Sequence, residues 1–193
     1  INRRMDREQL LTTIKHQLGD INIAVEVGVW RGSYSRSIIK NLQPTTFYGV
    51  DPYDIYEGYT DKPNLLEFQN NRSLEELYNR VMKTFKTFNT ELSHTNSKII
   101  REMGTNYAPT FADNTIDFVY LDSDHKYESV KSEINAWYPT VKVGGILAGH
   151  DYIVRSHIEE FGVIPAVTEF IERENLTLHT TDEEFSSWWV TKT

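Results

Sequence analysis

The order of strand-like and helix-like segments most constrains what this chain can fold into. Short runs rich in β-branched residues alternate with segments whose apolar residues recur at helical spacing. The expected strands are 21–27, 46–50, 98–101, 116–121 and 146–149, and the expected helices are 34–42, 74–88, 127–138 and 165–175. This alternation predicts a mainly parallel, doubly wound (Rossmann-like) α/β sheet with helices on both faces. Two closing strands, 176–180 and 187–191, are joined by a short acidic turn and predict an antiparallel hairpin at one edge.

The length of the chain argues for one domain. At 193 residues it is close to the size of a single α/β domain, for which roughly 150 residues is a common value. We therefore expect one domain over 1–193, with an N-terminal helix at about 6–18 and a core at about 21–193. The helix is expected to cover the sheet with its apolar face, and Gly19 stands where a helix stop is expected.

Composition excludes several classes of protein. The chain has no cysteine, which rules out disulfide frameworks, cysteine-based metal sites and thiol nucleophiles. Its formal net charge of −8 disfavours a nucleic-acid partner. No apolar run approaches the roughly 20 residues of a membrane span, and no signal-peptide pattern is evident. These features predict a cytoplasmic protein that acts on small molecules, with neither a membrane nor a nucleic acid as its partner.

A glycine-bearing turn follows the first expected strand. Ligands of doubly wound sheets bind at the carboxyl ends of strands, so the candidate cofactor-binding residues here are Glu26, Gly28, Val29, Trp30, Gly32 and Ser33. A dinucleotide fingerprint starting at Gly28 would need glycines where Trp30 and Ser33 stand. Asp51 ends the second strand about 20 residues later, where a carboxylate can accept both hydroxyls of an adenosine ribose. The pattern favours a nucleoside without a diphosphate.

Acids and a histidine end two further expected strands. Asp122 and Asp124 follow the fourth strand, and His150 and Asp151 follow the fifth. Neighbouring parallel strands lie about 5 Å apart, so these side chains can converge. Clustered carboxylates repel one another, and a divalent cation bound by Asp122, His150 and Asp151 would offset that repulsion. Because imidazole suits transition metals, manganese, iron or zinc are alternatives to magnesium.

These motifs resemble a known family. Residues 122–128 read Asp-Ser-Asp-His-Lys-Tyr-Glu, and Gly144-Gly145 leads to His-Asp-Tyr at 150–152. Together with the glycine turn, they resemble the class I S-adenosylmethionine-dependent methyltransferases, and within them the small bacterial and phage enzymes related to macrocin-type sugar O-methyltransferases. The resemblance implies a seven-stranded sheet whose last strand is antiparallel, with magnesium at the acidic cluster. It also implies that Glu26 holds the methionine amino end of S-adenosylmethionine and Asp51 the ribose, and it adds Asp122 to the cofactor site.

The implied reaction is transfer of the sulfonium methyl group to a hydroxyl of a small molecule such as a sugar. The metal would orient the hydroxyl and lower its pKa, while a base removes its proton. Asp124 is the first candidate for that base and His125 the second. Acceptor contacts would come from the loops at 53–64 and 152–164, where Tyr53, Tyr56 and Tyr59 could either form a lid or pack on the domain. A homodimer is the preferred oligomeric state.

Two other functions are compatible with these residues. A metal-dependent oxygenase or hydrolase could use His150 with the two aspartates while the nucleoside pocket is vestigial. A non-catalytic module could bind S-adenosylmethionine without transferring its methyl group, because a fold alone does not define an activity.

Overall fold

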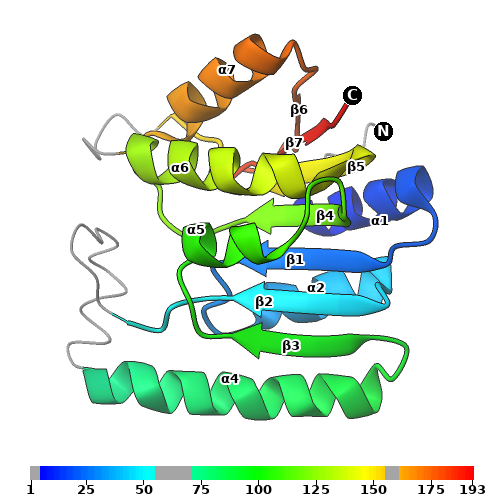
Figure 1. The fold of residues 1–193 in the computed structure, drawn as a ribbon, viewed down its shortest axis with the longest axis vertical. Coiled ribbons are helices and arrows are strands. Elements are labelled where there is room, and N and C mark those ends of the chain that lie inside the picture. The colour runs from blue at the N-terminus through cyan, green and yellow to red at the C-terminus, as the bar shows by residue number, and fades with distance from the viewer. Residues whose placement is uncertain (1–4, 55–70, 155–160) are drawn as a thin grey trace.

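In the computed structural model, which describes residues 5–54, 71–154 and 161–193, a central sheet has the order β3-β2-β1-β4-β5-β7-β6 (Figure 1). Its seven strands in the described residues are β1 (Ile23–Val27), β2 (Thr46–Val50), β3 (Asn96–Ile100), β4 (Ile116–Leu121), β5 (Val141–Gly149), β6 (His179–Thr180) and β7 (Trp188–Thr191). Strands β1 to β5 pair in parallel, whereas β7 runs antiparallel to both β5 and β6. The predicted sheet with an antiparallel C-terminal edge is therefore confirmed.

Helices cover both faces of the sheet. The main helices are α1 (Arg7–Leu18), α2 (Ser33–Leu42), α4 (Asn71–Glu91), α6 (Tyr127–Trp137) and α7 (Val163–Glu174). Short helical turns are α5 (Gly104–Tyr107), η1 (Ala108–Thr110) and η2 (Tyr138–Thr140). Helices α1, α2 and α4 share one hydrophobic core with the sheet, and α6 and α7 share the other. None of the helices in the described ranges is both long and apolar enough to cross a membrane.

Alternation of side chains along the strands produces the two cores. In β4, Phe118 and Tyr120 belong to the core under α1 and α2, while Val119 and Leu121 belong to the core under α6 and α7. The same rule separates the two tryptophans of β7. Trp189 enters the first core and Trp188 the second, so the two rings pack on opposite faces of the sheet.

Helix α1 begins and ends where the sequence indicated. Asp6 accepts hydrogen bonds from the backbone of Glu8 and Gln9, and the Gln9 side chain accepts one from the Asp6 N–H, which makes a capping box. Gly19 ends the helix with φ +66°. The first residue of this helix, Arg7, thereby has a fixed place and direction.

The bounds of the fifth and sixth strands differ from the sequence prediction. Gly144 and Gly145 were expected in a turn before the fifth strand, but β5 already begins at Val141 and includes both glycines. The pairing between β4 and β5 shifts register there, and Gly144 adopts φ +81°, so the glycines form an irregularity within the strand. The sixth strand is also shorter than expected, because only His179–Thr180 pair with β7.

Candidate functional site

The turn after β1 has a backbone that glycine alone can supply at its first position. Gly28 has φ +87°, and a Cβ atom placed on it would lie 2.1 Å from the carbonyl oxygen of Asp122. Its N–H donates to the carbonyl of Val50 at 2.9 Å, and the Asp122 N–H donates to the carbonyl of Val27 at 2.8 Å. The ends of β1, β2 and β4 are thus fastened together at this glycine.

The rest of the turn holds further left-handed residues. Trp30 has φ 52° and Gly32 has φ 77°, and a left-handed tryptophan is uncommon enough to need support from its surroundings. The Val29 side chain is buried in the core, so only its backbone can face a ligand. Ser33 is exposed as the first residue of α2. The predicted cofactor residues of the turn therefore lie together at the carboxyl end of β1.

Asp51 provides the support for this turn. Its Oδ2 accepts hydrogen bonds from the N–H groups of Val29 and Trp30 at 3.0 and 2.9 Å, and its Oδ1 accepts one from Tyr53 at 2.9 Å. Burial raises the pKa of Asp51, although the three backbone donors oppose that rise. A carboxylate offers about four acceptor positions, so about one remains for a ribose hydroxyl in this arrangement. Asp51 shapes the site as well as facing it.

Glu26 lies below the turn and is fully buried at 1% exposure. Ser35 in the first turn of α2 donates a hydrogen bond to its Oε2. Burial raises the pKa of Glu26 well above its ordinary value. A carboxyl group in such a place gains from a nearby cation, which is the property needed to hold an ammonium group.

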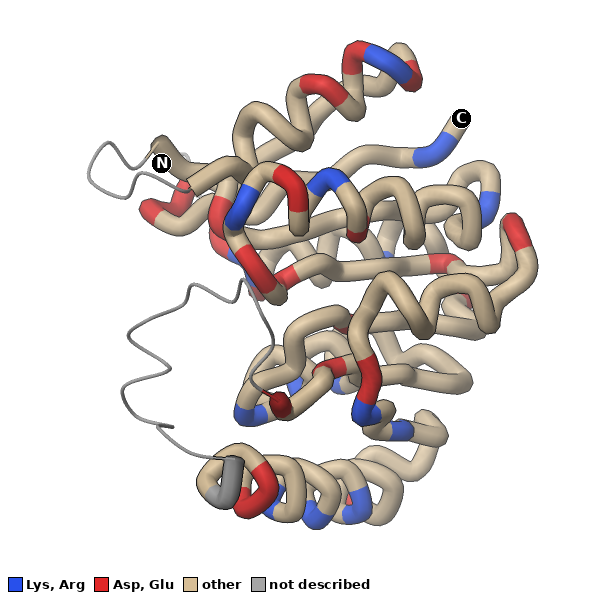
Figure 2. The backbone as a smooth tube through the Cα atoms, turned by 60° about the vertical axis from the view of Figure 1, so that its left-hand side comes forward, with Lys and Arg blue, Asp and Glu red and all other residues tan. Residues whose placement is uncertain are grey.

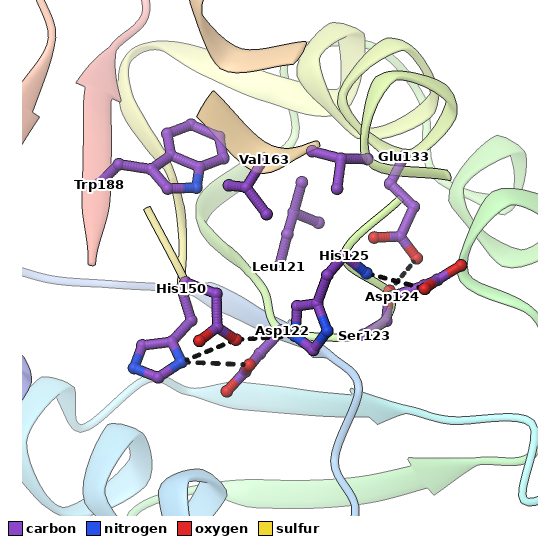
Figure 3. Close-up of a pocket in the computed structure, with 11 residues that line it drawn as sticks. Leu121, Asp122, Ser123, Asp124, His125, Glu133, His150, Val163 and Trp188 are labelled. Carbon is purple, nitrogen blue, oxygen red and sulfur yellow. Dashed lines mark hydrogen bonds and ion pairs between the residues drawn. The ribbon is translucent and has the colours of Figure 1, made fainter. Parts of the chain in front are cut away.

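The acids and histidines that end β4 and β5 converge, as Figure 3 shows for Asp122, His125 and His150. His125 Nε2 lies 2.7 Å from Asp151 Oδ2. His150 Nδ1 lies 3.2 Å from the same Asp151 oxygen and 3.6 Å from Asp122 Oδ1. Asp151 itself has φ 56°, so its backbone is held in an uncommon conformation at the centre of the cluster.

The electrostatics of this cluster couple the histidines to the carboxylates. Burial alone would lower the pKa of His150, but the adjacent Asp122 and Asp151 carboxylates raise it to about 9. Burial would raise the pKa of Asp151, but its hydrogen bonds to His125 and His150 outweigh that effect and lower it. These shifts favour an ionised Asp151 carboxylate beside a protonated His150, an arrangement suited to moving a proton.

The donor set fits a divalent metal ion. One ligand atom each from Asp122, His125 and Asp151 lie within 4.8 Å of one another. The predicted metal set had His150 in place of His125, and the Nδ1 atom of His150 lies beside the same two carboxylates. Two carboxylate oxygens with an imidazole nitrogen suit manganese, iron or zinc as well as magnesium.

The two candidate bases have different surroundings. Asp124 is buried at 6% exposure, and its carboxylate accepts hydrogen bonds from the Ser129 hydroxyl at 2.6 Å and from the His125 N–H at 2.8 Å. It does not cap α6, whose N-cap is Lys126. The His125 side chain is 27% exposed and stacks on Phe161 with ring centroids 4.8 Å apart. His125 is thus the more exposed of the two candidates, with its Nε2 directed at Asp151.

Two charged residues near the site had no place in the sequence motifs. Arg7 Nη1 lies 3.6 Å from Asp122 Oδ2, although about 115 residues of chain separate them. Glu133 accepts a hydrogen bond from Ser123 at 2.6 Å, and burial raises its pKa to about 7. The sequence carried a signal for Glu133, because its spacing from Val130 and Trp137 places it on the same buried face of the helix. Arg7 left no such signal in the sequence.

The expected acceptor loops are described in part. Tyr53 is buried, with φ 45°, and its hydroxyl donates to the Trp30 carbonyl at 3.0 Å, so it packs on the glycine turn. Tyr56 and Tyr59 lie outside the described residues, as do 155–160 of the second loop. The lid that these tyrosines could form therefore stays a prediction.

The sheet order, the glycine turn and the acids at the strand ends define a class I S-adenosylmethionine-dependent methyltransferase. A family profile described as a methyltransferase domain matches residues 25–152, a range that contains the turn, Asp51 and the acidic cluster. The chain belongs to this methyltransferase-domain family. No curated protein matched its sequence.

Solved structures share the fold over nearly the whole chain. The O-methyltransferase NovP is 22% identical, with a TM-score of 0.63 over 95% of this chain and 79% of its own. A Corynebacterium glutamicum protein is 16% identical, with a TM-score of 0.66 over 100% of this chain and 83% of its own. A Streptococcus mutans protein, provisionally described as a methyltransferase and crystallised with SAH, is 11% identical, with a TM-score of 0.62 over 98% and 99%. At these identities the likeness establishes the fold.

Proposed function

We propose that the protein is a divalent-metal-assisted O-methyltransferase that uses S-adenosylmethionine to methylate a hydroxyl of a small molecule such as a sugar or a sugar-containing metabolite. The observation that carries the proposal is the convergence of Asp122, His150 and Asp151, in which His150 Nδ1 lies 3.6 Å from Asp122 Oδ1 and 3.2 Å from Asp151 Oδ2. This cluster lies directly beside the glycine turn that Gly28 fastens to Asp122. The cofactor site and the site for cation and proton chemistry thus share Asp122. The macrocin-type motif at 122–128 and the O-methyltransferase NovP among the fold relatives support the same assignment.

The contacts suggest a role for each residue of the site. S-adenosylmethionine supplies an electrophilic methyl group on its sulfonium, and the sulfur keeps the bonding electron pair when the methyl leaves. Glu26 and Asp51 are assigned to its ammonium group and ribose. Asp122, Asp151 and His150 are assigned to the metal ion, which would lower the pKa of the acceptor hydroxyl.

His125 is the better-supported base for the acceptor proton. Its imidazole is 27% exposed, compared with 15% for His150, so it can reach an acceptor hydroxyl. Asp151 Oδ2, 2.7 Å away, orients the ring and would stabilise the imidazolium that forms, as a carboxylate does for a catalytic histidine. The carboxylate of Asp124, the first candidate, already accepts hydrogen bonds from the Ser129 hydroxyl and the His125 backbone N–H.

The charge of the protein supports a small-molecule acceptor. A net charge of −8 opposes the phosphate contacts that supply most nucleic-acid affinity. Among the described residues, Lys and Arg are spread over several elements, and α4 carries both signs (Figure 2). A homodimer and a cytoplasmic location remain parts of this proposal.

Thermal unfolding with S-adenosylhomocysteine, in EDTA or with added magnesium or manganese, tests the cofactor and the metal separately. A ligand at about 100 times its Kd adds about 2.7 kcal/mol, which raises the Tm by several degrees for a chain of this size. We expect that shift in the wild type and its loss in Asp51→Ala. Methyl transfer to a panel of sugar hydroxyls should then fall on adding EDTA.

Each part of the proposal can fail on its own. No Tm shift at saturating S-adenosylhomocysteine would reject the cofactor assignment and favour a metal-dependent oxygenase or hydrolase. Turnover that EDTA leaves unchanged would reject the metal. Cofactor binding with no transfer to any hydroxyl in a broad panel would favour the non-catalytic binding module.

A further inference from the structure

The first residue of α1, Arg7, directs its guanidinium toward the cofactor end of the sheet. The Cζ atom lies 4.2 Å from the centroid of the Tyr34 ring, and the Tyr34 hydroxyl donates to the Arg7 carbonyl at 3.1 Å. The capping box of Asp6 fixes the helix start immediately before it. These contacts hold the backbone and the stem of Arg7 on α2, so the direction of the guanidinium is set before any ligand binds.

The N–H donors of the Arg7 guanidinium are available to a ligand. Among the described residues its one ion pair is with Asp122 Oδ2, at 3.6 Å, which is longer than a hydrogen bond. Within the described part of the chain it makes no hydrogen bond, although a guanidinium carries five N–H donors. The side chain is only 31% exposed, and a largely buried cation without hydrogen bonds is unfavourable. A ligand that supplied a hydrogen-bond acceptor would remove this unfavourable free energy.

The neighbouring charges indicate which acceptor fits. Glu26 and Asp122, at the ends of β1 and β4, both interact electrostatically with Arg7. One cation beside two acids is complementary to an α-amino acid, whose ammonium group pairs with the acids and whose carboxylate pairs with the cation. Arginine is the side chain best shaped for a carboxylate, because its planar fork donates two parallel hydrogen bonds.

We propose that Arg7 binds the α-carboxylate of the methionyl part of S-adenosylmethionine, so that α1 completes the cofactor site. This inference rests on S-adenosylmethionine being the methyl donor. It makes Arg7 a cofactor-binding residue that distinguishes the intact amino-acid end of the cofactor from a decarboxylated one.

Calorimetric titration with two ligands tests the assignment without any turnover. One ligand is S-adenosylhomocysteine, and the other is its decarboxylated analogue, which keeps the amino group, the thioether and the nucleoside. We expect the wild type to prefer S-adenosylhomocysteine by about tenfold or more, which corresponds to about 1.4 kcal/mol per factor of ten. Arg7→Met should lose that preference by weakening S-adenosylhomocysteine while changing the analogue less than about threefold.

Two further variants separate recognition from folding. Arg36→Met is the matched control, since Arg36 also lies over an aromatic ring, that of Phe88, and pairs with Glu91 on the surface. It should keep the wild-type preference. Arg7→Lys keeps the charge without the planar fork, so it should retain the fold and show an intermediate preference, and thermal unfolding of each variant checks the fold.

Three results would overturn the inference. Equal weakening of both ligands by Arg7→Met would assign Arg7 a purely structural role in docking α1. Unchanged S-adenosylhomocysteine affinity in Arg7→Met and Arg7→Lys would show that the carboxylate binds elsewhere. A wild type that binds neither ligand would remove the inference together with the cofactor assignment, a failure distinct from the other two.

Discussion

Glu133 provides a direct test of the electrostatics beneath the site. It lies on the buried face of α6 at 9% exposure, where it accepts a hydrogen bond from Ser123 at 2.6 Å. Burial raises its pKa from the ordinary value of 4.5 to about 7, even though the Ser123 hydrogen bond opposes the change. The folded protein therefore binds this proton more tightly than the unfolded chain does.

The sign and size of the effect follow from that difference. Because the native state holds more protons between the two pKa values, the free energy of unfolding falls as pH rises from about 4.5 to about 7. At about 1.36 kcal/mol per pKa unit, the loss between pH 5 and pH 8 is about 2–3 kcal/mol. Glu133→Gln keeps the acceptor for Ser123 but cannot ionise. The variant should therefore gain about 2–3 kcal/mol on the wild type over that interval, or about 5–10 °C in Tm.

Urea unfolding of the wild type and Glu133→Gln at pH 5, 6, 7 and 8 measures this gain as a difference, so other titrating groups cancel. Glu128→Gln on the same helix is the matched control, since Glu128 is exposed. Its difference from the wild type should stay constant with pH. If the Glu133→Gln difference is equally flat, then the carboxyl is not desolvated as the structure requires, and the reasoning is refuted.

Two pairs of substitutions test the turn and the base. Gly28→Ala should cost about 2–4 kcal/mol, because its Cβ meets the Asp122 carbonyl at 2.1 Å and its φ is +87°, whereas Gly19→Ala, with φ +66° and open space, should cost about 1 kcal/mol by urea unfolding. Similar costs at the two glycines would contradict the close approach. His125→Asn should lower kcat about 100-fold or more while leaving the Kd for S-adenosylhomocysteine within about threefold, and Asp124→Asn should chiefly lower the Tm. The reverse pattern would make Asp124 the base.

The sheet could be predicted because its signals are local. Each parallel strand is a short β-branched run followed by a helical segment, and connection length dictates parallel or antiparallel pairing. β2 and β4 were predicted at their observed bounds. The irregular start of β5 was missed, because Gly144 and Gly145 form a turn or a strand irregularity depending on how the neighbouring strand pairs. That information is not local.

The site was predictable to the extent that strand ends define it. Asp122, His150 and Asp151 converge because the ends of neighbouring parallel strands meet at one edge of the sheet. The place of each imidazole depends on side-chain packing, and His125 stacks on Phe161, which follows it by 36 positions. Asp51 was assigned to a ligand from its position, but its three bonds to the adjacent backbone could be seen only in three dimensions.

Helix α1 links the cofactor site to the other end of the chain. At 12 residues, it is too short to be stable by itself, so its position depends on what it packs against. Its start is tied to the C-terminal hairpin by two hydrogen bonds between Met5 and Asp182, at 3.0 and 2.8 Å. Its last turn is tied to β7 by Gln17, which donates to Thr191 at 2.8 Å. Because the C-terminal segment thus holds both ends of α1, the antiparallel edge that closes the sheet also sets where Arg7 meets Asp122.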